Sequence, residues 1–324
     1  GAASAQSSVT LFGIVDLAYV NVKNGSQKTN LLSSNQYNSN RLGFRGVEDL
    51  GGGLRAGFWL EGAMNNDTGE GTATGGGQNW QRRSTVSLMG GFGEIRLGRD
   101  YTPSFWNYTV FDPFGTNGPG SMLNLVSTLN SGAGTLLRAN NTVGYFLPAA
   151  GGLYGQVQVA AGEGTTVGNK YQGVRLGYSG GPVNVAVAYG QTPSDGGLAD
   201  DFTDTNIGGS FAMGPFTLIA QYSQRDFATA DQKTLLVGGA LAMGAGTLRF
   251  SYVQSDGSST AFEAKQMAVG YYYDLSKRTT LYGVASQLDN EAGARFWIGS
   301  GSVPAAPTSG FKSTGFALGI RHSF

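Results

Sequence analysis

The chain has 324 residues and a formal net charge of zero, from 21 basic and 21 acidic side chains. Only 13% of the residues are charged, about half the usual fraction, and 54 are glycine. The charge balance argues against a nucleic-acid partner, which would require a basic surplus. With no cysteine and one histidine, His322, the sequence has almost no material for a metal site or a histidine-dependent catalytic centre. We therefore expect no cofactor and no enzyme activity.

The amino-terminal segment, residues 1–5, contains Ala3-Ser4-Ala5, a small-x-small pattern typical of an export-signal cleavage site. We interpret residues 1–5 as a signal-peptide remnant or an expression scar. No linker or shift of composition divides the rest of the chain, so residues 6–324 are expected to form one domain.

Apolar and polar side chains alternate along most of the chain, as in strands that have one apolar face. No run of about 18 apolar residues could form a transmembrane helix, but a strand crosses a membrane with only about 9–11 residues. In chain order, the alternation predicts sixteen strands: Ser8–Val22, Arg41–Glu48, Leu54–Met64, Arg82–Met89, Glu94–Tyr101, Arg138–Leu147, Leu153–Ala161, Lys170–Tyr178, Val183–Gln191, Thr205–Ala212, Phe216–Gln224, Lys233–Ala242, Gly246–Gln254, Glu263–Tyr273, Thr279–Gln287 and Ser313–Phe324.

Short turns and long loops are expected to alternate strictly between these strands, which gathers them at opposite rims. The pattern predicts an all-β fold, a 16-stranded antiparallel transmembrane β-barrel, because hydrocarbon tolerates no unpaired strand edge. A barrel of this size leaves a water-filled channel. The alternative, a glycine-rich soluble β-sandwich or binding module, would need a more highly charged surface.

The last predicted strand has one face on which every second side chain is large: Phe316, Leu318, Ile320, His322 and Phe324. A closing strand with a final aromatic residue at the membrane interface is typical of outer-membrane barrels. The bacterial outer membrane is therefore the expected location.

The longest break between strands, about Thr102–Leu137, is too long for an ordinary connection. It contains one acidic residue, Asp112, and no basic residue. Because so apolar a segment would be unusual on an outer surface, we expect it to fold into the lumen and narrow the channel. Four of its aromatic side chains could anchor it to the wall or, alternatively, stack a solute ring: Phe105, Trp106, Tyr108 and Phe111.

Five arginines lie on the polar face of their strands: Arg41, Arg45, Arg138, Arg175 and Arg249. An arginine facing lipid at the bilayer centre costs about 2–4 kcal/mol, so these side chains are expected to line the channel. The alternative for each is a solvated position near a rim. Arg82 and Arg83 are adjacent, and alternation sends them to opposite faces without deciding which faces inward. Arg83 or Arg99, if outward, would need burial against another subunit.

Several motifs closely resemble the trimeric general-diffusion porins of Gram-negative bacteria, and most of all the anion-selective porins of betaproteobacteria. The resemblance implies sixteen strands, a homotrimer surrounded by outer-membrane lipid and lipopolysaccharide, and a third loop that forms an eyelet in the lumen. The motifs that carry it are Ser8-Val-Thr-Leu-Phe-Gly-Ile-Val-Asp16, Arg41-Leu-Gly-Phe-Arg-Gly-Val-Glu-Asp-Leu-Gly-Gly-Gly53, Phe92-Gly-Glu-Ile-Arg-Leu-Gly-Arg99, Asp274-Leu-Ser-Lys-Arg278 and Gly319-Ile-Arg-His-Ser-Phe324.

The resemblance also implies an arginine cluster opposite the third loop, formed here by Arg41, Arg82 and Arg138, and it favours the inward position for Arg82. Many relatives have a Pro-Glu-Phe-Gly element in this loop, whereas this chain lacks the glutamate. The departure favours anions over cations. The loop residues expected at the constriction are Asp112, Pro113, Phe114, Gly115 and Asn117.

Two functions remain open at this stage. The first is a passive channel for small hydrophilic solutes that prefers anions, because a positive lumen concentrates them. The alternative is a substrate-specific channel for one small organic anion, such as a dicarboxylate or an aromatic acid.

Overall fold

The computed structural model describes residues 8–164, 167–299, 303–304, 306 and 308–324. Residues 1–5, interpreted above as a signal remnant or scar, lie outside the described residues. One α-helix occurs in the described part, α1 (Pro103–Val110), together with single 3₁₀ turns at Met122–Leu125, Ser194–Gly196 and Thr260–Phe262. No helix in these ranges is long and apolar enough to cross a membrane.

The described strands are β1 (Ser8–Asn24), β2 (Gln27–Ser34), β3 (Arg41–Gly51), β4 (Leu54–Asn65), β5 (Glu70–Gly71), β6 (Arg83–Gly90), β7 (Gly93–Tyr101), β8 (Arg138–Phe146), β9 (Leu153–Ala160), β10 (Tyr171–Gly180), β11 (Val183–Thr192), β12 (Phe202–Met213), β13 (Phe216–Phe227), β14 (Ala230–Met243), β15 (Gly246–Gly257), β16 (Ala264–Asp274), β17 (Thr279–Asn290) and β18 (Lys312–Ser323).

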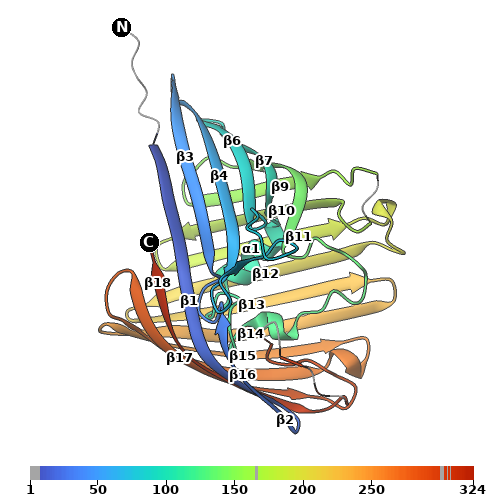
Figure 1. Cartoon of the computed structure of the whole chain (residues 1–324). Coiled ribbons are helices and arrows are strands. Elements are labelled where there is room, and N and C mark those ends of the chain that lie inside the picture. Colours follow the sequence, from blue (N-terminus) through green and yellow to red (C-terminus); the bar gives the residue numbers. More distant parts are fainter. Residues whose placement is uncertain (1–7, 165–166, 300–302, 305, 307) are drawn as a thin grey trace.

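These strands form a closed antiparallel barrel with sixteen strand positions, as predicted. β2 and β3 both pair with β1, one along each half of it, and so occupy one position; β5 is a two-residue strand paired to β4. β1 also pairs with β18, which leaves the sheet without a free edge (Figure 1). We call the rim with the short connections, such as Gly90–Gly93, the turn rim, and the opposite end the loop rim.

The strict alternation of short turns and long loops is wrong at two places. β1 and β2 are joined at the loop rim only by Gly25 and Ser26, and β13 and β14 are joined there only by residues 228–229. Gly25 and Ser26 are the two central residues of this turn, and Gly25 adopts a positive φ of 60°. Glycine at the first central position of a two-residue loop is a hairpin signal. Strand β2 was therefore detectable, although the predicted strands omit it.

Large apolar side chains cover the outer face and are largely exposed, for example Val86 at 55% and Leu318 at 52%. Exposed aromatic residues lie on both sides of this apolar band: Tyr178, Phe211 and Tyr273 near the turn rim, and Tyr19, Tyr189, Tyr222 and Tyr252 toward the loop rim. Such aromatic girdles mark the two membrane interfaces of a transmembrane barrel. His322 lies on the outer face, because it follows the exposed row of Leu318 and Ile320.

Residues 102–137, the constriction segment, fold into the lumen as predicted, and α1 lies inside the cylinder (Figure 1). Asn107 of α1 donates to the carbonyl of Ala186 and accepts, through its own carbonyl, a bond from Gln221. Pro103 occupies the first position of the helix, where a missing backbone N–H costs nothing. This short helix is absent from the predicted elements.

Inward-facing glycines make room for the constriction segment. A Cβ atom at Gly208 of β12 would lie 2.2 Å from the ring of Phe111, and one at Gly238 of β14 would lie 3.0 Å from Pro113. Phe111 is fully buried. Glycine at these positions therefore allows the backbone of the barrel wall and the rings of the segment to approach closely.

Candidate functional site: an arginine wall facing the constriction segment

Three arginines meet on the wall formed by β3, β6 and β8, as the resemblance implied. A single carboxylate, Glu61 of β4, lies 3.4 Å from Arg41 Nη1 and 2.7 Å from Arg82 Nε. Arg138 donates from Nε to the backbone carbonyl of Arg82 at 2.9 Å, and its guanidinium lies 4.4 Å from the ring centroid of Tyr101. We call Arg41, Arg82 and Arg138 the arginine wall.

Arg82 reaches this wall because it precedes strand β6 rather than belonging to it. Its backbone N–H donates to the carbonyl of Glu61 at 3.0 Å, and β6 starts one residue later, at Arg83. Arg83 pairs with Glu61 across the strands and places its guanidinium 4.3 Å from the Trp59 ring centroid. The expectation that Arg82 and Arg83 face opposite sides is therefore wrong, because both lie on the lumenal side.

Two residues of the wall were not singled out from the sequence. Glu61 is 6% exposed and also accepts a bond from Trp59 Nε1 at 2.9 Å, while the Tyr101 hydroxyl accepts one from Arg82 Nη2 at 3.0 Å. The signal for Glu61 was present, since it alternates with the outward residues Phe58 and Leu60 of β4. The signal for Tyr101 was weaker, because a bulge between Gly98 and Asp100 disturbs the alternation of β7.

Arg45 and Arg175 face the lumen but do not join the arginine wall. Arg45 lies four residues nearer the turn rim than Arg41, with its guanidinium 5.2 Å from Phe12 and 5.0 Å from Trp59. Arg175 donates from Nε to Asn107 Oδ1 of α1 at 2.5 Å. Arg175 therefore anchors the constriction segment, and its charge contributes less directly to the electrostatic potential of the channel opening.

The only acidic residue of the constriction segment is turned into the segment itself. Asp112 Oδ1 accepts from the backbone N–H of Phe114 at 2.9 Å, and Oδ2 accepts from those of Thr116 and Met122 at 3.1 and 3.0 Å. Asp112 is 4% exposed, and burial raises the pKa of its carboxyl group to about 6. Asp112 lies in the constriction segment, but its charge closes a turn and does not face the arginine wall.

The other predicted loop residues hold the tip of the segment in place. The carbonyl of Pro113 accepts from Arg249 Nη1 at 3.2 Å, and Phe114 is 1% exposed. Gly115 has a φ of 58°, a left-handed conformation that glycine adopts without strain. Asn117 Oδ1 accepts from Ser39 Oγ at 2.9 Å, which joins the tip to the chain between β2 and β3.

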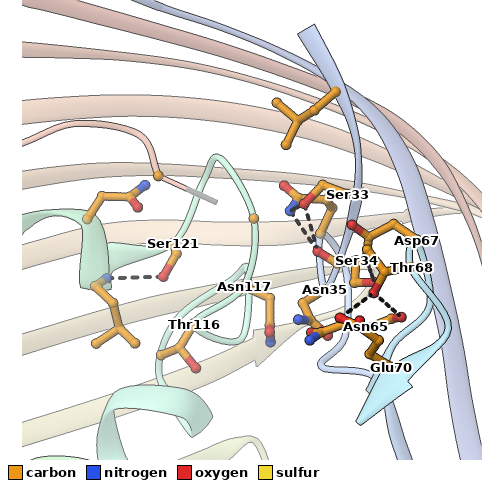
Figure 2. A pocket seen from close by; sticks show the side chains of 16 residues that line it. Ser33, Ser34, Asn35, Asn65, Asp67, Thr68, Glu70, Thr116, Asn117 and Ser121 are labelled. Atoms are coloured by element: carbon orange, nitrogen blue, oxygen red, sulfur yellow. Dashed lines mark hydrogen bonds between the residues drawn. The ribbon is translucent and has the colours of Figure 1, made fainter. Parts of the chain in front are cut away.

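A polar cavity of about 560 Å³ lies on the loop-rim side of this tip. Figure 2 shows Asn35, Asn65 and Glu70 on one side of it, and Thr116 and Asn117 of the constriction segment on the other. Two carboxylates, Asp67 and Glu70, line the cavity together with amides and hydroxyls, without a basic lining residue among the described residues. The arginine wall supplies the basic groups that the lining of this cavity lacks.

The charges at the constriction leave a local surplus of positive charge. Within the arginine wall, Arg41 and Arg82 share one carboxylate, Glu61, while Arg138 bonds only a backbone carbonyl. The carboxylate of Asp112 is enclosed by backbone N–H groups of its own turn. Rings of arginine around a narrow opening favour anions, and low-dielectric walls strengthen the effect. The arrangement contains no base paired with a nucleophile, and what it can do is concentrate and pass small anions.

Comparison with known proteins supports this interpretation. The family model described as Gram-negative porin matches residues 1–293. The chain is 38% identical over 341 residues to outer membrane porin protein 32 of Delftia acidovorans, covering 100% of this chain and 96% of the relative. It is 26% identical over 392 residues to an outer membrane porin protein of Bordetella pertussis, with the same coverage.

The solved structures agree with the sequence comparison. The anion-selective porin from Comamonas acidovorans superimposes with a TM-score of 0.90 at 33% identity, covering 98% of this chain and 100% of that chain. OmpT of Vibrio cholerae, solved in a trimer form, gives a TM-score of 0.70 at 15% identity, covering 98% and 99%, and so shares the fold. Members of this family are channels and not enzymes. The chain belongs to the Gram-negative porin family and is an outer-membrane β-barrel that encloses a diffusion channel.

Proposed function

We propose that this porin, as one barrel domain over residues 6–324, conducts small hydrophilic solutes with a preference for anions set by the arginine wall. The observation that carries the proposal is the convergence of Arg41 and Arg82 on one carboxylate, Glu61, with Arg138 bonded beside them to the backbone carbonyl of Arg82. The structurally similar porin from Comamonas acidovorans is described as anion-selective, which supports the same preference here. The preference acts on small anions in general, because the wall presents charge and no shaped pocket.

The test is the reversal potential of the purified protein in planar bilayers under a gradient of potassium chloride. An anion-preferring channel gives the sign expected for chloride permeation. The sign expected for potassium permeation would overturn the proposal. Replacing the salt by one with a bulkier anion should reduce the current more than replacing the cation does.

We also infer that the porin assembles as a homotrimer through its amino-terminal strands. Arg99 supports this inference, because it follows the outward row of Ile95 and Leu97 on β7. Its Nη1 donates to Asn140 Oδ1 at 2.6 Å and its Nε to the carbonyl of Gln81, which leaves the charged group on the outer face. A contact with another subunit would remove that charge from lipid. Native mass spectrometry in detergent tests this, and a monomer at every protein concentration would contradict it.

A charged belt on the outer face supports a lipopolysaccharide partner. On β13, β15 and β17, glutamines donate to outward-facing aspartates in the pairs Gln224–Asp226, Gln254–Asp256 and Gln287–Asp289. On the intervening strands, exposed lysines occupy the same height: Lys233, Lys265 and Lys312. The belt lies just beyond Tyr222 and Tyr252 of the loop-rim girdle, at headgroup level. Lysines there would bind lipid phosphates, and the aspartates would bind through bridging divalent cations.

The lipid proposal is tested by binding of lipid A to the detergent-solubilised protein. Replacing Lys233, Lys265 and Lys312 together by glutamine should weaken binding of phosphorylated lipid A severalfold. Lys277→Gln, at the turn rim, is the matched control for loss of a surface lysine. Equal binding of phosphorylated and dephosphorylated lipid A would overturn the role of the lysines.

A further inference from the structure

A second group of basic and aromatic residues lies on the same wall, nearer the turn rim than the arginine wall. It lines a cavity of about 400 Å³ formed by the ends of β1, β3, β4, β6 and β7. Arg45, Trp59 and Arg83 form its centre, and the hydroxyl groups of Ser8 and Thr10 lie at its edge. The function proposed for the arginine wall does not use this cavity.

The indole of Trp59 lies between two guanidinium groups that come from the strands on either side of β4. Arg45 of β3 is 5.0 Å and Arg83 of β6 is 4.3 Å from the ring centroid. Arg45 also lies 5.2 Å from the ring of Phe12, which packs edge-on against Trp59. Aromatic faces stabilise cations at such distances. The indole therefore holds both guanidinium groups beside the lumen without neutralising either.

Both guanidinium groups keep unused hydrogen-bond donors. Arg45 is exposed. Its guanidinium donates no hydrogen bond to any of the described residues and lies beside two aromatic rings. Arg83 donates only from Nε, to Thr85 Oγ1 at 3.0 Å. A guanidinium with a free pair of N–H groups binds a carboxylate or phosphate oxygen pair in a fixed, two-pronged geometry.

The nearby acidic residues do not occupy these donors. Glu94 lies 2.9 Å and Asp100 2.7 Å from the guanidinium nitrogens of Arg96, so this arginine is the one that is neutralised. The remaining surplus around Trp59 consists of the two charges of Arg45 and Arg83. Each guanidinium has free donors for one oxyanion group, so a ligand that carries two such groups engages both.

The cavity is joined to the arginine wall and yet distinct from it. Trp59 Nε1 donates to Glu61 Oε2, while Glu61 Oε1 contacts Arg41 and Arg82. Glu61 thus lies between the two groups and fixes the orientation of the indole. An anion that leaves the arginine wall toward the turn rim next encounters Arg83 and Arg45.

We propose that this cavity is a second anion site, in series with the arginine wall, for small organic dianions whose two oxyanion groups bind Arg45 and Arg83. The proposal rests on the anion preference proposed above and adds a ligand class and a location to it. Such a site gives a dianion a longer residence than a monoanion of the same size, because only the dianion uses both guanidinium groups. The site faces the turn rim, so its occupancy depends on the side from which the solute enters.

Single-channel recording in planar bilayers tests the proposal with succinate and acetate as probes in a chloride background. Succinate added on the turn-rim side should reduce the chloride current saturably, and acetate should not. The side is assigned with Lys277→Cys in the turn between β16 and β17, because the chain otherwise has no cysteine for a charged thiol reagent to modify.

The informative variant is Arg45→Gln combined with Arg83→Gln, for which the half-blocking concentration of succinate should rise at least about tenfold. Arg55→Gln removes an arginine of β4 at the turn rim outside the cavity lining and is the matched control, for which we expect an unchanged half-blocking concentration. If the double variant inserts poorly, Arg45→Gln alone suffices, because Arg45 is exposed and forms no hydrogen bond among the described residues.

Equal block of the parent and of the double variant would overturn the second site, as would equal block from both sides of the membrane. Block by inorganic phosphate that disappears in the double variant would keep the site and broaden its ligand class. Failure of the anion preference itself is recognised separately, by the sign of the reversal potential in potassium chloride alone.

Discussion

The charge of the constriction is set by one residue as much as by the three arginines. Glu61 is shared by Arg41 and Arg82 and also accepts the indole N–H of Trp59. It lowers the positive potential of the wall and at the same time holds two like charges near each other. Its loss should therefore change selectivity and stability in opposite directions.

The variant Glu61→Gln is expected to increase the anion preference, because the arginine wall loses the carboxylate that Arg41 and Arg82 share. A unit charge at about 8 Å in water contributes about 0.5 kcal/mol for each passing ion, so the anion-to-cation permeability ratio should rise severalfold. The barrel should become about 1–3 kcal/mol less stable, because Arg41 and Arg82 lose a charged acceptor. Reversal potentials and urea titration of the folded barrel measure the two effects. A reversal potential equal to that of the parent would contradict the assignment.

Arg138→Gln should lower the anion-to-cation permeability ratio severalfold for the same electrostatic reason. Arg175→Gln is the matched control, since Arg175 also lies inward but bonds Asn107 of α1 and not the arginine wall. We expect that control to alter current noise more than selectivity. A larger shift of the reversal potential in Arg175→Gln than in Arg138→Gln would contradict the assignment of Arg138 to the arginine wall.

At this scale the sequence predicted most inward arginines but not their partners. Strand alternation alone placed Arg41, Arg45 and Arg138 in the lumen. It failed for Arg82, because this residue lies outside the strand and the period of two does not apply to it. The inward position of Arg82 came from the family resemblance, and its contact with Glu61 depends on the pairing of β4 with β6.

The constriction segment is held by packing against glycines and by polar contacts with the wall. Arg225 of β13 is fully buried and donates to the hydroxyls of Tyr108 and Thr234 and to the amide oxygen of Gln232. The Tyr108 hydroxyl in turn donates to Asp204 Oδ1 at 2.9 Å. A buried charge with these partners is costly to expose, so α1 is expected to stay against the wall during conduction.

Gly208→Ala should displace Phe111 and with it the constriction segment. The added Cβ atom would lie 2.2 Å from the Phe111 ring, and overpacking of this kind costs about 1–3 kcal/mol. We expect a lower unfolding midpoint and a noisier single-channel current. Gly144→Ala is the matched control, because its nearest neighbours would be at ordinary contact distances of 3.5 Å or more. Equal effects of both substitutions would exclude the packing explanation.

Asp112→Asn should loosen the turn at the tip of the same segment. The asparagine amide oxygen can replace only one of the two carboxylate oxygens, which leaves the N–H of Phe114 or those of Thr116 and Met122 without an acceptor. A buried unsatisfied group costs about 1–3 kcal/mol. The current should fluctuate more while the reversal potential changes little, since the charge of Asp112 does not face the arginine wall. A large shift of the reversal potential would show that it does.

Among the elements, long strands were predictable and local features of the lumen were not. The alternation identified the position of the constriction segment through its length and apolar composition, but α1 depends on contacts with β10 and β11 that lie far away in the sequence. β2 was hidden because its polar residues alternate weakly, although the Gly25-Ser26 turn marked it. The conformations of α1 and β2 both depend on contacts with strands of the barrel wall.

For the whole molecule, closure of the sheet is the condition for everything described above. It was predictable from the number of strands and the apolar row of the last strand. The register that closes the barrel was not predictable, because it places Ile14 opposite Ser323 through contacts between the two ends of the chain. Backbone bonds of 3.0 Å in both directions between Gly13 and Phe324 complete this seam.

Gly13→Ala is therefore expected to weaken the whole barrel and not only its own strand. The new Cβ atom would lie 2.3 Å from the Phe324 ring and 2.7 Å from the carbonyl oxygen of Arg41, so the seam must shift. Overpacking costs about 1–3 kcal/mol, and here it acts where an opened edge would leave backbone groups unpaired in lipid. Urea titration of the protein in micelles should give a lower midpoint. Gly209→Ala is the matched control, because Gly209 also lies on the outer face, in β12, and its added Cβ atom would have no neighbour closer than 3.5 Å. This variant should leave the midpoint unchanged. If Gly13→Ala and Gly209→Ala gave the same unfolding midpoint, closure of the barrel would not depend on the close approach at Gly13.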